Sequence, residues 1–132
     1  MTISANTVRE LREKTNAGMM DCKKALEETG GDMEQAIELL RKKGLSIAAK
    51  KASRTANEGI LGYYYNEKEG LSCLVEVNCE TDFVVKTAEF QNFVKQATDL
   101  VKTKNPKDLD SLRQSVASTV TALVAKIGEN IQ

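Results

Sequence analysis

Residues 71–84 read Leu-Ser-Cys-Leu-Val-Glu-Val-Asn-Cys-Glu-Thr-Asp-Phe-Val, and this stretch decides the fold because a strand pattern gives way to a helix pattern within it. Residues 71–78 predict a strand, and the residues after Val84 predict a helix. A corner of this kind could present Asp82 and Phe83 to a partner on a rigid support. In a plainer interpretation, Thr81 or Asp82 caps the helix and Phe83 fills the core. The corner taken alone favours the plainer interpretation.

Composition limits the class of protein. The 132 residues suffice for one ordinary domain or two small ones. Nineteen basic and nineteen acidic residues cancel, so no overall field attracts nucleic acid or a membrane surface. No apolar run is long enough for a membrane span, and residues 1–6 lack the blocks of a secretory signal. We therefore expect a cytoplasmic protein with no membrane partner and no direct nucleic-acid partner.

The inventory of reactive side chains argues against an enzyme. The sequence contains no histidine, which excludes serine–histidine and cysteine–histidine catalysis and removes a common metal ligand. Cys22, Cys73 and Cys79 form no Cys-x-x-Cys pair, so neither a disulfide framework nor a zinc site is indicated. Cys73 and Cys79 share a strand face with Val75 and Val77 and are expected to be small buried residues. We expect no catalytic residue, metal or cofactor.

The first half of the chain predicts three short helices. They cover about residues 7–13 and 20–29, followed by a helix that Asp32 caps and Gly44 ends, and then a linker at residues 45–58. Met19 and Met20 are adjacent and cannot both face one narrow core, so at least one should be exposed to a partner. Six basic residues and no acidic one lie within residues 41–54. These predict a solvated helix face or, less simply, a patch that contacts phosphates.

The second half changes its hydrophobic period from helix to strand and back. Strands are predicted at residues 59–65 and 71–78, joined by a loop in which Gly70 can adopt positive φ. Two amphipathic helices follow, and residues 129–132 resemble the start of a third strand. The predicted fold is α+β: a three-helix bundle at residues 1–54, then a small antiparallel sheet packed with helices at residues 55–132, incomplete at its C-terminus.

An incomplete sheet predicts self-association. Two strands leave unpaired backbone groups along an edge, and the apolar face assigned to Tyr63, Tyr65, Val75 and Val77 has few elements to cover it. We expect a homodimer through the core sheet, because two-fold pairs are the commonest oligomers.

Five segments, in this order along the chain, resemble the elongation factor Ts family. They are LREKT at residues 11–15, AGMMDCKKAL at 17–26, AAKKA at 48–52, VEVNCETDFV at 75–84 and AKIGENI at 125–131. Asn16 departs from the family's usual glycine, a mild change because Asn tolerates left-handed geometry. Longer members of the family carry a second core subdomain and a helical-hairpin insertion to which nothing here corresponds.

The resemblance implies a ubiquitin-associated-like N-terminal domain, an α+β core subdomain and a role as a guanine-nucleotide exchange factor in translation elongation. Such a factor binds elongation factor Tu in its GDP-bound or nucleotide-free state, displaces Mg²⁺ and promotes GDP release. Two sets of residues would make the contacts: Thr81, Asp82, Phe83 and Val84 beside the nucleotide, and Leu11, Arg12, Met19 and Met20 elsewhere on the same G domain.

Two other functions fit parts of the chain. The first is a non-catalytic protein-binding module, in which the N-terminal three-helix domain binds a peptide or a ubiquitin-like partner. The second is an adaptor that contacts RNA through residues 41–54.

Overall fold

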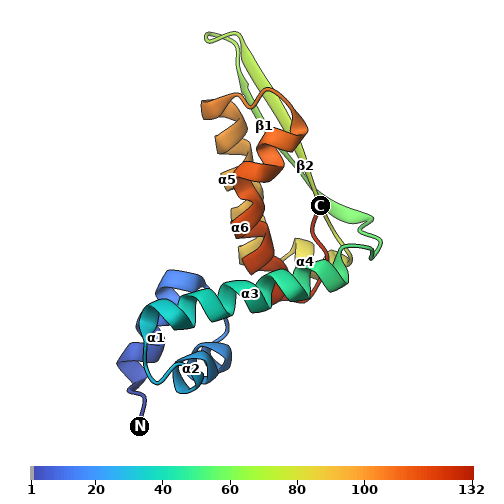
Figure 1. Ribbon diagram of the computed structural model, residues 1–132. Coiled ribbons are helices and arrows are strands. Elements are labelled where there is room, and N and C mark those ends of the chain that lie inside the picture. Colours follow the sequence, from blue (N-terminus) through green and yellow to red (C-terminus); the bar gives the residue numbers. More distant parts are fainter. Residues whose placement is uncertain (1) are drawn as a thin grey trace.

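The computed structural model describes residues 2–132 and confirms the predicted α+β class (Figure 1). Within these residues, six helices accompany one antiparallel sheet of two strands. The elements are α1 (Ala5–Thr15), α2 (Met19–Glu28), α3 (Met33–Lys51), β1 (Glu58–Asn66), β2 (Leu71–Cys79), α4 (Asp82–Val85), α5 (Ala88–Lys104) and α6 (Leu109–Ile127).

The first two helices and the start of α3 enclose a small apolar core. The Asp32 carboxylate begins α3 by accepting the Gln35 backbone N–H at 2.9 Å, a capping bond that satisfies an otherwise unpaired donor. Asn16 ends α1 in a left-handed conformation with φ of 54°. The buried side chains of this core are Val8, Leu11, Cys22, Ala25, Leu26 and Ala36.

The prediction that Gly44 ends the third helix is wrong. α3 continues for seven residues beyond Gly44, and Figure 1 shows it extending from the N-terminal bundle to the base of the core. A Cβ on Gly44 would lie 3.4 Å from Thr121 Cγ2 and 3.9 Å from the Ala125 Cβ. Gly44 therefore lets α3 and α6 approach closely, and this packing outweighs its poor helix propensity.

Residues 45–51 are consequently helical, although the sequence assigned them to a linker. Ala48 packs against the buried cluster of the second half of the chain. The division into domains at residues 54 and 55 stays a prediction, and α3 contributes side chains to both buried clusters.

The hairpin packs one face on α5. Its register pairs Ile60 with Val77 and Gly62 with Val75, so these residues share a face. Val75, Val77 and Cys79 are buried there, as predicted, whereas Cys73, which was predicted to be buried with them, is only half-buried. The apolar face of α5 covers them with Phe90, Phe93, Val94 and Ala97.

The opposite face of the hairpin carries Tyr63 and Tyr65, which the sequence analysis had assigned to one apolar face together with Val75 and Val77. Tyr63 pairs with Leu74, so Tyr63 and Tyr65 point away from Val75 and Val77, contrary to the prediction. Cross-strand partners lie on the same face of the sheet. Which residues are partners depends on the register of the two strands, and the tertiary structure sets that register. Tyr63 is 77% exposed. The open face of the hairpin includes Leu61, Tyr63, Tyr65 and Leu74, all exposed, together with Glu76, the exposed cross-strand partner of Leu61.

At the predicted start of a third strand, a single pair of residues, Asn78 and Gln132, exchanges backbone hydrogen bonds. The Asn78 N–H donates to the Gln132 carbonyl at 2.7 Å, and the Gln132 N–H donates to the Asn78 carbonyl at 3.0 Å. Residues 129–132 have no strand assignment, but Ile131 is buried. The chain thus returns to the edge of β2 beside the β2–α4 corner.

We expect Gly62→Ala to destabilise the fold because Gly62 lets α5 approach β1. An added Cβ would clash with the Thr98 hydroxyl and lie 3.0 Å from Val94 Cγ1. Overpacking of this kind should cost about 1–3 kcal/mol in the free energy of unfolding, measured by urea denaturation. Adding Thr98→Ala removes the clashing oxygen and should restore part of the loss. Purely additive losses in the double variant would contradict this account.

Candidate functional site

The corner between β2 and α4 is built by Thr81. Its backbone is extended, and its hydroxyl accepts the Val84 N–H at 3.5 Å, which begins the single turn of α4. Of the two predicted capping residues, Thr81 therefore caps this helix and Asp82 occupies its first position. The Val84 side chain is buried among the core residues.

The corner presents Phe83 to solvent. The ring is 76% exposed, so the interpretation in which Phe83 fills the core is wrong. Asp82 is also exposed and pairs with Lys86, whose Nζ lies 3.5 Å from the Asp82 carboxylate and 6.0 Å from the centre of the Phe83 ring. An exposed phenylalanine is of the residue type that is enriched in protein interfaces, although the neighbouring carboxylate is not.

The four corner residues singled out from the sequence thus divide into two pairs. Asp82 and Phe83 face outward, whereas Thr81 is half-buried and Val84 is buried. The inward pair holds the turn in place, and the outward pair is available for contact.

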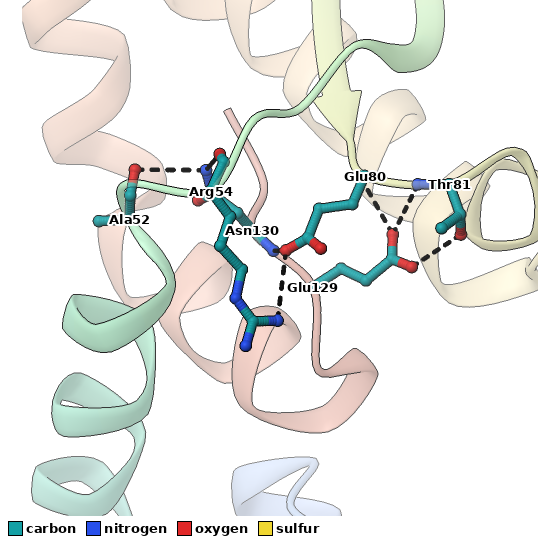
Figure 2. A network of polar contacts seen from close by, with 6 residues as sticks. All are labelled: Ala52, Arg54, Glu80, Thr81, Glu129 and Asn130. Atoms are coloured by element: carbon teal, nitrogen blue, oxygen red, sulfur yellow. Dashed lines mark hydrogen bonds and ion pairs between the residues drawn. The ribbon is translucent and has the colours of Figure 1, made fainter.

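The corner is held by polar contacts that sequence reasoning missed (Figure 2). The Glu129 carboxylate accepts the Glu80 N–H at 3.1 Å, the Thr81 N–H at 3.0 Å and the Thr81 hydroxyl at 2.7 Å. The Cys79 thiol donates to the Thr81 carbonyl at 3.2 Å. Burial, and then the nearby Glu129 charge, raise the pKa of this thiol, which keeps it protonated as a donor.

A second carboxylate, that of Glu80, contacts the backbone next to Glu129. The Glu80 carboxylate accepts the Asn130 N–H at 2.7 Å and lies 3.7 Å from the Arg54 guanidinium. The Asn130 side chain in turn donates to the Arg54 and Ala52 carbonyls, at 2.7 Å and 3.4 Å. Figure 2 shows the resulting clasp, which we define as Glu80, Thr81, Glu129 and Asn130.

The clasp joins segments that are about fifty residues apart in the chain, so no local pattern could reveal it. The only sequence signal was that residues 75–84 and 125–131 both carried the family resemblance. That resemblance assigned roles to Thr81 but none to Glu80, Glu129 or Asn130.

The N-terminal candidates divide in a similar way. Met19 and Met20 open α2 and are 44% and 61% exposed, so both methionines are available, where the sequence required at least one. Arg12 is exposed, whereas Leu11 is fully buried in the bundle core. In Figure 1, α2 and α4 lie toward opposite ends of α3, so the structure does not gather the two candidate sets into one site.

An open groove of about 880 Å³ lies between the N-terminal bundle and the helical side of the core. Its lining includes Gly18 and Asp21 at the start of α2, Gly44 on α3, Phe93 on α5 and Lys126 on α6.

The basic segment at residues 41–54 is largely paired with acidic side chains. Arg41 and Lys42 contact Glu38, and Lys43 lies 2.6 Å from Asp21. The hydrogen bonds from Arg41 hold the pKa of Glu38 below its ordinary value. These pairs support the solvated-face interpretation over the phosphate-contact interpretation.

Within residues 2–132, two other kinds of feature are absent. No group of three or more Cys, Asp or Glu side chains in this range is arranged to hold a metal ion. None of the helices in the described part of the chain has the length and apolar character needed to span a membrane.

Comparison with known proteins shows which family has sequences similar to this one. Residues 80–132 match the family model described as Elongation factor TS. Elongation factor Ts of Clostridium perfringens strain 13 is 50% identical over 136 aligned positions, covering 98% of this chain and 45% of the relative. The protein of the same name from Thermoanaerobacter sp. strain X514 is 60% identical over 105 positions, covering 80% and 52%.

A third relative has the same name and a similar identity. Elongation factor Ts of Thioalkalivibrio sulfidiphilus is 49% identical over 138 positions, covering 100% of this chain and 47% of the relative. The chain spans about half the length of the curated relatives it matches.

Proposed function

The chain belongs to the elongation factor Ts family, and from this membership we propose that it is a guanine-nucleotide exchange factor in translation elongation. Its partner would be elongation factor Tu in the GDP-bound or nucleotide-free state. The observation that carries the proposal is the exposed Phe83 ring beside Asp82 on a turn fixed by the clasp.

Exchange of this kind works through competing contacts. A GTPase holds GDP through phosphate-binding backbone groups and a Mg²⁺ ion. A factor that binds best to a site distorted by loss of Mg²⁺ weakens the nucleotide, and by linkage the nucleotide weakens the factor equally. In our proposal Phe83 supplies buried aromatic area, while Asp82 disturbs the hydrogen bonds around the metal.

No step of this mechanism needs a proton transfer or a covalent intermediate by the factor. The absence of histidine from the sequence is compatible with it. We therefore propose that the protein is not itself a catalytic enzyme. As a factor in translation elongation, we propose, it acts in the cytoplasm.

The N-terminal bundle would supply affinity. Met19, Met20 and Arg12 are exposed and could contact the G domain directly. Leu11 would act by supporting that surface from within the bundle core. Thr81 and Val84 would similarly support the turn that presents Asp82 and Phe83.

The direct test is the release rate of fluorescently labelled GDP from elongation factor Tu, measured with and without this protein. Acceleration that saturates with protein concentration is expected. Binding to elongation factor Tu without acceleration at micromolar concentration would instead favour the non-catalytic binding module.

We expect Phe83→Ala to lower the rate of GDP release at least tenfold while leaving the fold intact. A central aromatic anchor is typically worth about 2 kcal/mol or more to an interface, and this ring contributes little to the core. Stopped-flow release assays and urea denaturation measure the two effects. Phe93→Ala is the matched control: Phe93 is buried, so its loss should cost about 3–5 kcal/mol of stability.

Asp82→Ala belongs to the same experiment. It should slow exchange but hardly change helix content, because Thr81 and not Asp82 accepts the capping hydrogen bond. A Phe83→Ala protein that has lost several kcal/mol of stability, or that exchanges normally, would contradict the proposed role of the corner.

We expect Met20→Ala to raise the protein concentration needed for half-maximal exchange but to leave the maximal rate unchanged. Met20 is exposed on α2, which lies away from α4 in Figure 1, and would contribute only to binding. Met33→Ala, at a methionine packed on the bundle core, is a control that should lower stability instead. Point variants suit this test better than deletion of residues 1–54, because Ala48, Ala52 and Arg54 contact the core. A reduced maximal rate in Met20→Ala would contradict the division of roles.

We also propose that the isolated chain forms a two-fold homodimer through its sheet. Leu61, Tyr63, Tyr65 and Leu74 are all exposed on the open face, and no described element covers them. Sedimentation over a concentration series should show a dimer, and Tyr63→Glu should shift the protein to monomer. A wild-type protein that remains monomeric at high micromolar concentration would refute this proposal.

A further inference from the structure

We propose that Glu129 is a positioning residue: its carboxylate fixes the backbone at Glu80 and Thr81, and thereby the direction in which Asp82 and Phe83 project. The functional consequence rests on the proposed exchange activity. The structural consequence, an ordered corner, can be tested without it.

The geometry of the carboxylate is specific to the start of the turn. Oε1 accepts two consecutive backbone N–H groups, from Glu80 at 3.1 Å and Thr81 at 3.0 Å. Oε2 accepts the Thr81 hydroxyl at 2.7 Å. The two backbone bonds orient both peptide groups between Cys79 and Thr81, and the hydroxyl bond fixes the Thr81 side chain. Bonds to an ionised acceptor are roughly twice as strong as neutral ones.

The fixed Thr81 side chain sets the position of α4. The same hydroxyl that donates to Glu129 accepts the Val84 N–H and so begins this helix. α4 has a single turn, in which Val84 is buried and Val85 packs half-buried against the same core. These contacts hold the end of the turn, whereas the placement of Asp82 and Phe83 at its start depends on the residue that precedes them.

In the clasp, each glutamate accepts backbone N–H groups from the segment that carries the other glutamate, so both segments are held. While Glu129 binds the corner, the Glu80 carboxylate accepts the Asn130 N–H at 2.7 Å. Asn130 is buried and its side chain donates to the Arg54 carbonyl at 2.7 Å, just beyond α3. The two glutamates would repel each other, but four hydrogen bonds and the Arg54 guanidinium satisfy their charges.

A purely structural role for Glu129 makes a different prediction. If the clasp only stabilises the core, its loss lowers the free energy of unfolding but leaves the maximal exchange rate of the folded protein unchanged. If it positions the corner, the maximal rate falls even when the folded protein is saturating, because Asp82 and Phe83 no longer project toward the nucleotide.

Three substitutions separate geometry from charge. Glu129→Ala removes all three acceptor contacts. Glu129→Gln keeps an oxygen for both backbone N–H groups, and its amide can donate to the Thr81 hydroxyl, which can act as acceptor. Glu129→Asp keeps the charge but is one methylene shorter, and it serves in place of the alanine variant should that variant fail to fold. Glu67→Ala is the matched control, because this exposed glutamate lies in the loop between β1 and β2.

The first measurement is amide hydrogen exchange by NMR. In Glu129→Ala, the amides of Glu80 and Thr81 should exchange about tenfold faster or more, while those of Val75 and Val77 in β2 keep their protection. Glu129→Gln and Glu67→Ala should resemble wild type. Unchanged corner amides in Glu129→Ala would overturn the inference.

The second measurement is the maximal rate of labelled GDP release from elongation factor Tu. Glu129→Ala should lower it about tenfold or more, since small misplacements of reacting or contacting groups have effects of this size. Glu129→Gln should restore it to within about twofold. Loss of corner protection with a normal maximal rate, or a glutamine variant as defective as alanine, would overturn the positioning role. Failure of wild type to accelerate release would refute the exchange function instead, and amide exchange would still show whether Glu129 orders the corner.

Discussion

The crossed pair of glutamates at the base of the sheet is the constraint that joins the β2–α4 corner to the segment that follows α6. Glu129 binds the backbone that follows β2, and Glu80 binds the backbone that follows α6. Asn130 extends the same clasp to the residues that follow α3. Three chain segments thus meet where no regular ladder could satisfy their backbone groups, and ionised acceptors take that role.

Two glycines allow helices to pack closely against their neighbours. Gly44 lets α3 lie close against α6, and Gly62 lets α5 lie close against β1. In both places, the missing Cβ leaves room for a neighbouring threonine, Thr121 or Thr98. The long helix α3 can therefore connect the N-terminal bundle to the core as one rigid element, rather than through a flexible linker.

The proposed function uses this rigidity directly. An exchange factor performs no bond chemistry of its own, so its effect depends on holding a few side chains where they compete with a nucleotide and its metal ion. Two exposed surfaces, at Met19 and Met20 and at Asp82 and Phe83, lie toward opposite ends of α3. A stiff connection between them would let one surface provide affinity while the other acts at the nucleotide.

The sequence by itself determined the elements with strong local signals: the α+β class, the hairpin with Gly70 at positive φ, and the cap at Asp32. It left the cap of α4 open between Thr81 and Asp82. It also pointed to the corner that presents Phe83. The family model that matches residues 80–132 agrees with the resemblance seen in the sequence. Tertiary structure alone decided that Phe83 faces solvent, that α3 passes through Gly44, and that Tyr63 opposes Leu74. Burial, helix approach and strand register depend on residues distant in the chain. The clasp between Glu80 and Glu129 is the extreme case, because neither carboxylate has a partner until the fold brings residues nearly fifty positions apart into contact.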